Sequence, residues 1–140
     1  MNRLLRACAG FAALLLVSGI AAHAQEPQCS GAQKPRRVAE LMFGRKSSDG
    51  IGVNEVAWAR FLDQEITARF PDGFTVLSGG GQWRDQISKK IIREPSRVVQ
   101  IVLPGEPEDL ARLNEIVEAY KGRFRQQSVA VILHRACVSF

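Results

Sequence analysis

The chain has 140 residues, and its 19 Lys and Arg against 14 Asp and Glu give a net charge of +5. These basic residues are scattered along the sequence, whereas a nucleic-acid-binding protein concentrates them in a patch or stripe. The composition therefore argues against a nucleic-acid partner, and the length is that of one ordinary globular domain.

The N-terminal segment has the three parts of a secretory signal peptide. Arg3 and Arg6 supply positive charge, residues 7–22 are almost wholly apolar, and Ala22-His23-Ala24 is a small-x-small cleavage site. We expect cleavage after Ala24, which makes residues 1–24 a signal peptide and the mature protein periplasmic or secreted. The apolar stretch is shorter than the roughly 20 residues of a membrane-spanning helix, so we expect no stable membrane anchor.

Cleavage would remove Cys8 and leave Cys29 and Cys137 as the remaining cysteines. An even pair in an exported chain predicts a disulfide, which here would join the start of the mature chain to its last strand. A redox pair is the weaker alternative, because there is no Cys-x-x-Cys motif. With both thiols oxidised and His134 the single histidine after cleavage, we expect no metal site and no cofactor.

The mature chain opens with a polar stretch, residues 25–36, that predicts a flexible N-terminal arm before a single domain at residues 37–140. Arg37 to Arg45 is rich in Leu, Met and Phe and predicts a strand. Asn54 can cap a helix whose apolar residues recur at intervals of three and four as far as Phe70.

Two strands, a helix and a final strand follow. A strand is expected at 74–77, extended after Gly79-Gly80-Gly81 by 82–84, and a second strand at 91–103. The glycine run predicts a bulge or bend, since no helix N-terminus follows it as in a phosphate-binding loop. A helix from about Pro107 to Phe124 and a strand from Ser128 to Phe140 complete the chain.

The order strand, helix, strand, strand, helix, strand predicts an α+β fold, the ferredoxin-like βαββαβ sandwich. Right-handed crossovers place both helices on one face of a four-stranded antiparallel sheet and leave the other face open. In this topology the first and third strands are neighbours, so Glu40 and Gln100 could touch on the open face. The apolar residues around this pair favour a homodimer interface, whereas Glu40 used in acid–base catalysis is the alternative.

Short motifs spread along the domain resemble those of an uncharacterised bacterial family, domain of unknown function 3574 (DUF3574). Phe74 is a mild departure, because the family pattern has leucine there. The resemblance covers nearly all of the mature chain and carries no activity that could be transferred. The matching motifs are Phe43-Gly44-Arg45, Val53, Trp58, Phe70-Pro71-Asp72-Gly73-Phe74-Thr75-Val76, Gly81-Gln82-Trp83-Arg84, Arg93-Glu94-Pro95-Ser96, Gln127-Ser128-Val129 and Cys137-Val138-Ser139-Phe140.

The expected hairpin gathers polar groups that could form a ligand site. If its strands pair around residues 85–90, Gln82 lies opposite Arg93 and Gly81 lies opposite Glu94. Two guanidinium groups beside an indole suit a carboxylate or phosphate ligand, and a glutamate could orient an arginine or act as a base. The alternative is an internal network in which Glu94 pairs with Arg84 or Arg93. The candidate site residues are Gln82, Trp83, Arg84, Arg93, Glu94 and Ser96.

The sequence therefore leaves the function open among three hypotheses. The first is a periplasmic or secreted binding module that recognises an anionic or polar partner through the 82–96 hairpin. The second is a cofactor-free enzyme that uses Glu94 or Glu40 as acid–base and Arg84 or Arg93 to hold an anion. The third is a structural envelope protein that forms a homodimer through its open sheet face.

Overall fold

The computed structural model describes residues 27–46, 52–86 and 88–140. The signal peptide expected at residues 1–24 and the beginning of the expected arm lie outside these residues. Within the described ranges, no helix has the length and apolar character needed to cross a membrane.

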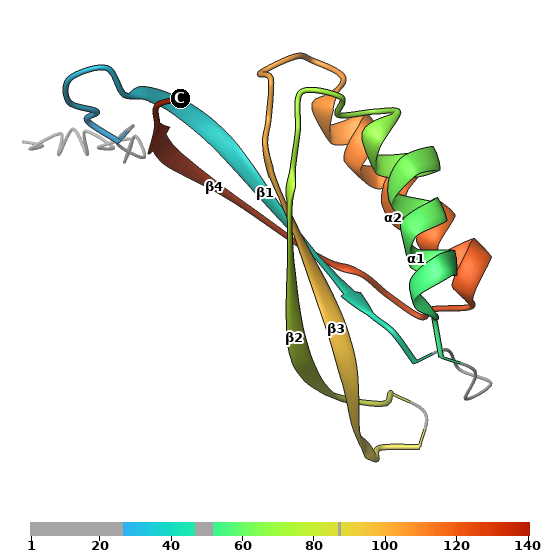
Figure 1. Ribbon diagram of the computed structural model, residues 1–140. Coiled ribbons are helices and arrows are strands. Elements are labelled where there is room, and N and C mark those ends of the chain that lie inside the picture. The colour runs from blue at the N-terminus through green and yellow to red at the C-terminus, as the bar shows by residue number, and fades with distance from the viewer. Residues whose placement is uncertain (1–26, 47–51, 87) are drawn as a thin grey trace, which may run out of the picture.

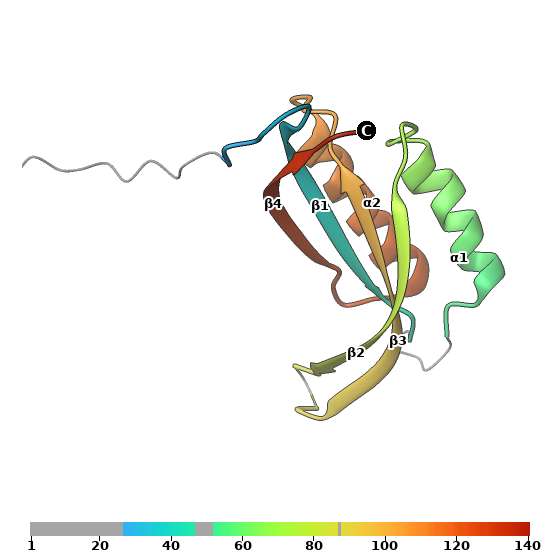
Figure 2. The same cartoon turned by 60° about the vertical axis from the view of Figure 1, so that its left-hand side comes forward.

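The elements follow the expected βαββαβ order, and the sheet is antiparallel with strand order β2-β3-β1-β4. Both helices lie on the same face of the sheet (Figures 1 and 2). The α+β ferredoxin-like prediction is therefore confirmed. The elements are β1 (Lys34–Gly44), α1 (Glu55–Phe61), η1 (Leu62–Thr67), β2 (Thr75–Arg84), β3 (Ile91–Val102), α2 (Asp109–Phe124) and β4 (Ala130–Val138).

Several element boundaries differ from the expectation. β1 begins at Lys34 because residues 34–36 pair with the end of β4, so this part of the expected flexible arm is strand. The Asn54 side chain caps α1 by accepting a hydrogen bond from the Ala57 amide at 2.8 Å, as expected. The helix changes to π-helix after Phe61, and β2 continues through the glycine run without a break.

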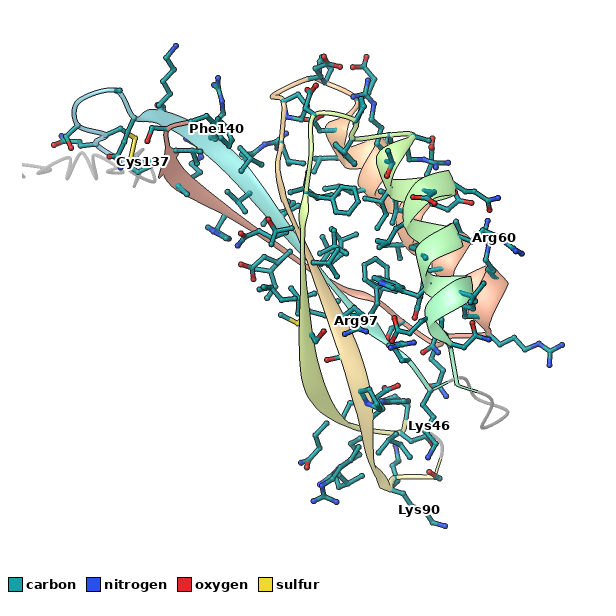
Figure 3. The ribbon with its side chains drawn as sticks, viewed as in Figure 1. Lys46, Arg60, Lys90, Arg97, Cys137 and Phe140 are labelled. Carbon is teal, nitrogen blue, oxygen red and sulfur yellow. A yellow bond between two sulfur atoms is a disulfide. The ribbon has the colours of Figure 1, made fainter. Side chains whose placement is uncertain are left out.

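The helix-covered face is packed with aromatic rings. Phe43 of β1 lies 4.7 Å from Tyr120 of α2 and 5.4 Å from Trp58 of α1, measured between ring centroids. Phe61 joins the same cluster, and Figure 3 shows side chains filling the space between the sheet and the helices. Side chains alternate along β1 and β3, so every second residue packs into the core beneath the helices and the residues between them lie on the open face.

A disulfide joins Cys29 to Cys137, with a Cα–Cα distance of 5.4 Å and a sequence separation of 108 residues. It ties the segment before β1 to the end of β4. The adjoining strand ends are also paired with each other, with Lys34 opposite Val138. The predicted disulfide is therefore present in the structure.

Candidate functional site

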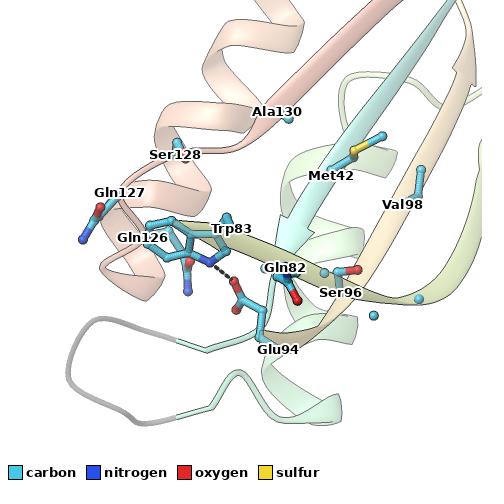
Figure 4. Close-up of a pocket in the computed structure, with 14 residues that line it drawn as sticks. Met42, Gln82, Trp83, Glu94, Ser96, Val98, Gln126, Gln127, Ser128 and Ala130 are labelled. Atoms are coloured by element: carbon cyan, nitrogen blue, oxygen red, sulfur yellow. Dashed lines mark hydrogen bonds between the residues drawn. The ribbon is translucent and has the colours of Figure 1, made fainter. Parts of the chain in front are cut away.

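A pocket of about 450 Å³ lies on the open side of the sheet, at the end nearest the β2–β3 hairpin. Its walls come from β1, β2, β3 and the segment 126–130 that leads from α2 into β4 (Figure 4). The hairpin bends away from the helices beyond the edge of the main sheet (Figure 2). Three strands and a connecting segment that are distant in sequence thus enclose one hollow.

The pocket includes the glycine run of β2. Gly79 pairs with Ser96 and Gly81 with Glu94, so both glycines occupy positions on the pocket side of the sheet. Neither is among the glycines with positive φ, and a Cβ on either would come no nearer than 3.5 Å to Ser96. Neither backbone conformation nor packing within the described chain requires glycine here. Their effect is to leave space and to expose backbone to whatever enters the pocket.

Glu94 is the buried acidic group of this pocket, with 7% of its surface exposed. The indole Nε1 of Trp83 donates to Oε1 at 2.7 Å, and the backbone amide of Lys46 donates to Oε2 at 2.7 Å. Gly44 makes room for the carboxylate, because a Cβ there would lie 2.5 Å from Oε1. Across the described ranges, no lysine or arginine side chain forms an ion pair with Glu94.

The strand end beside Glu94 is also fixed from the core side. The hydroxyl of Tyr120 donates a hydrogen bond to the carbonyl of Gly44 at 2.8 Å, and the amide of Arg45 donates to the carbonyl of Pro95 at 3.0 Å. Burial raises the pKa of the Tyr120 phenol well above its usual value; the Arg45 charge opposes this rise, and the nearby Glu94 charge adds to it. The phenol therefore remains a protonated donor at any physiological pH.

Two glutamines bring the α2–β4 segment to the hairpin. Gln127 Nε2 donates to Asp85 Oδ2 at 3.0 Å, which connects this segment to the end of β2. Gln126 lines the pocket, and its Nε2 is buried with no hydrogen-bond partner in the part of the chain that the structure describes. A buried amide donor without an acceptor costs about 1–3 kcal/mol, so this nitrogen is a group that a ligand could satisfy.

The structure divides the six-residue hairpin cluster that the sequence suggested. Gln82 lies opposite Arg93 and Gly81 opposite Glu94, as expected. Because side chains alternate along a strand, Glu94 faces the pocket while its neighbour Arg93 faces the other way. Trp83 and Arg84 are separated in the same manner. Trp83, Glu94 and Ser96 line the pocket from its own face of the hairpin. Gln82 also borders the pocket, although by the same alternation it belongs to the Arg93 face.

Arg84 and Arg93 are exposed on the far side of the hairpin. Neither forms a hydrogen bond or ion pair within residues 27–46, 52–86 and 88–140. The suggested pairing of Glu94 with one of these arginines is therefore wrong, because strand alternation directs them to opposite faces.

The second suggested pair does make contact. Gln100 Nε2 donates to Glu40 Oε1 at 3.1 Å on the open face, where the two residues are register partners. Gln100 also borders a second hollow of about 590 Å³ beside the C-terminal Phe140. Among the described residues, no group of three or more His, Cys, Asp or Glu side chains could hold a metal ion.

Sequence reasoning missed the pocket. Met42, Val98 and Gln126 line it, yet they are far apart in the sequence and carry no motif of their own. The available signal was the glycine run inside a strand, where glycine weakens the strand and marks a close approach by another group.

The described domain matches a family model. The model described as "Protein of unknown function (DUF3574)" covers residues 38–140, which is most of the chain and includes all the sheet pairing around the pocket. No curated protein matches the chain significantly.

Solved structures share the fold at low identity. A phage SAM lyase in complex with S-methyl-5'-thioadenosine is 16% identical, with a TM-score of 0.59 over 84% of this chain and 97% of that chain. The apo state of a phage SAM lyase gives a TM-score of 0.56 at 16% identity, over 81% of this chain and 90% of that chain. At this identity the likeness shows a common fold alone.

Proposed function

The chain belongs to the DUF3574 family, whose function is unknown, and we propose that it is a binding module that captures a small polar ligand in the open-face pocket. The observation that carries the proposal is the pair Gly79 and Gly81. They hold open a hollow of about 450 Å³ although neither φ nor packing requires glycine at either position. A protein that did not use this space would gain strand stability by filling it, because glycine in a strand costs about 0.5–1 kcal/mol relative to alanine.

The lining of the pocket supports a polar ligand more than an anionic one. The arginines that would have held an anion lie on the other side of the hairpin, and Glu94 contributes the ionisable group inside the pocket. A cofactor-free enzyme that combines Glu94 with Arg84 or Arg93 gains no support, since these side chains do not meet.

We propose that this binding module is exported from the cytoplasm. The charged, apolar and small-residue pattern of residues 1–24 and the Cys29–Cys137 disulfide support a periplasmic or secreted protein that is cleaved after Ala24. The intact mass of the exported protein tests this. A product that retains Leu14 to Val17 would contradict it.

Binding is tested by filling the pocket from its glycine floor. A ligand-observed NMR screen of small polar compounds, with S-methyl-5'-thioadenosine among the probes, should find compounds whose signals Gly79→Ala and Gly81→Ala abolish. Gly80→Ala is the matched control, because its methyl group would point to the opposite face and meet nothing within 4 Å. Hits that survive both pocket substitutions, or no hits from the screen, would contradict the proposal.

A second candidate, self-association, is favoured by one observation. β4 is an edge strand, and its consecutive apolar residues Val131, Ile132 and Leu133 are 40–44% exposed. Ile132 shares the open face with Met42, whereas Val131 and Leu133 lie on the helix side of the same edge strand. The exposed apolar edge therefore suits pairing with a second copy of the chain. Light scattering should then give a dimer mass, and a monomer at every accessible concentration would contradict this candidate.

A further inference from the structure

We propose that the ligand of this pocket carries an organic cation, a substituted ammonium or guanidinium group, which pairs with Glu94. This inference rests on the binding function proposed above and assigns the charge of the ligand. It starts from a carboxylate that is buried in the wall of a hollow and forms no ion pair with a lysine or arginine of the described chain.

The ligand would supply a positively charged partner for the Glu94 carboxylate. A buried charge is strongly unfavourable unless it is paired and hydrogen-bonded, and the described part of the chain supplies hydrogen bonds to Glu94 but no ion pair. The Trp83 indole and the Lys46 amide each donate one bond to the carboxylate. An ionised carboxylate has about four acceptor sites, so capacity for further donors remains.

The groups around Glu94 suit an organic cation better than a hydrated metal ion. The hydrogen bond from Trp83 Nε1 fixes the indole beside the carboxylate (Figure 4), and an aromatic face attracts an ammonium or guanidinium group. Met42 and Val98 add apolar surface, which favours alkyl substituents over bound water. Among the residues that the structure describes, no other carboxylate lines the pocket to complete an oxygen-rich metal site.

Gln126 indicates a second feature of the same ligand. Gln126 lines the pocket, and its buried side-chain Nε2 lacks an acceptor in the described part of the chain. A ligand with a hydroxyl, carbonyl or ether oxygen beside its cation would satisfy both this donor and Glu94. The pocket thus fits a small molecule with a cationic head and a neutral hydrogen-bond acceptor.

Three probes of nearly the same shape test the charge directly. Choline is positive and carries a hydroxyl, 3,3-dimethyl-1-butanol is its neutral isostere, and 3,3-dimethylbutanoate is a negative analogue. The indole N–H signal of Trp83 in the disulfide-bonded mature protein, assigned by comparison with Trp83→Phe, reports binding. We expect choline to bind about tenfold more tightly than the neutral alcohol, and the anion to bind most weakly.

Two variants separate charge from space. Glu94→Gln should bring choline and the neutral alcohol to equal affinity, whereas Gly81→Ala should weaken both alike while Glu94 stays in place. Because Glu94→Gln also changes a buried hydrogen-bond network, its fold is checked by the signal dispersion of the same spectrum. If that variant does not fold, the comparison of the three probes on the wild-type protein decides the question.

The outcomes distinguish this inference from the binding proposal. Equal affinity for choline and the neutral alcohol, or preference for the anion, would overturn the cation inference and leave the binding function standing. If the Glu94→Gln variant still preferred the cation, the inference would also be overturned, because a group other than Glu94 would then recognise the positive charge. Failure of every compound, in this set and in the wider screen, would instead remove the binding function itself.

Discussion

Two neighbouring residues of β1 show how differently the two faces of this sheet are used. Phe43 is fully buried among the rings of Trp58, Phe61 and Tyr120, whereas Met42 is 37% exposed and borders the pocket. The core face is filled by large aromatic side chains. The open face around the pocket has glycine at positions 44, 79 and 81, so the same strands provide packing on one side and space on the other.

The two regions meet at Gly44, the last residue of β1. From the core side, Tyr120 donates its hydroxyl to the Gly44 carbonyl, and on the pocket side the Glu94 carboxylate occupies the place of a Cβ. The rigid aromatic core therefore fixes the backbone on which the pocket carboxylate rests. Stability should depend on the core face and ligand capture on the open face, with Gly44 affecting both.

Phe43→Ala should cause the largest loss of stability, about 3–5 kcal/mol, because it leaves a cavity inside the aromatic cluster. Met42→Ala on the opposite face should cost much less, because the side chain is partly exposed and little cavity forms. Chemical denaturation of both variants measures the difference. Equal losses would show that the open face is packed as a second core and is not a free surface.

Removing the disulfide should have the next largest effect. Cys29→Ala with Cys137→Ala releases a closure that spans 108 residues of sequence, and loss of such a bridge typically costs about 2–5 kcal/mol. The pocket lies at the other end of the molecule, so ligand affinity should be unchanged in the folded variant. A loss of affinity without a loss of stability would contradict the separation of the two regions.

Gly44→Ala should affect both regions, with a stability loss of about 1–3 kcal/mol from overpacking. Its methyl group would lie 2.5–2.8 Å from the Glu94 carboxyl atoms, which must then move out of the wall. We expect the preference for a cationic probe to fall together with stability. Gly81→Ala provides the control, because it fills the pocket without touching Glu94 so closely.

Tyr120→Phe should cost less, about 0.5–1.5 kcal/mol for the lost hydrogen bond to Gly44. The phenol also predicts a pH dependence, because its pKa in the folded protein is raised by burial above the usual value of about 10. A raised pKa contributes stability below pH 10 that is lost as the pH rises further. Tyr120 is the single tyrosine, so the tyrosinate absorbance reports it alone, and ionisation near pH 10 in the folded protein would contradict the assignment.

The local sequence patterns predicted the fold, its register and the disulfide well. Apolar periodicity placed both helices, and alternation placed Glu40 and Gln100 on the same open face, where they make a hydrogen bond. The same alternation, applied to the hairpin, would have separated Glu94 from Arg93, but the proximity of the residues in sequence suggested one cluster. The pocket itself could not be predicted, because Gln126 lies in the connection between α2 and β4, which only the folded chain brings to the hairpin.

The smallest effects should come from the exposed arginines of the hairpin. Arg84→Ala and Arg93→Ala should each change stability by about 0–1 kcal/mol, the range of surface ion pairs, since neither side chain has a partner among the described residues. Ligand capture should also be retained, because both side chains face away from the pocket. Thermal melts and the Trp83 indole signal measure the two effects together.

A large loss of stability that neutralising Glu94 restores would show that the cluster is an internal brace after all. A loss of binding with normal stability would instead place the ligand on the arginine side of the hairpin. Near-wild-type behaviour in both measurements would leave the open-face pocket as the side of the hairpin that binds.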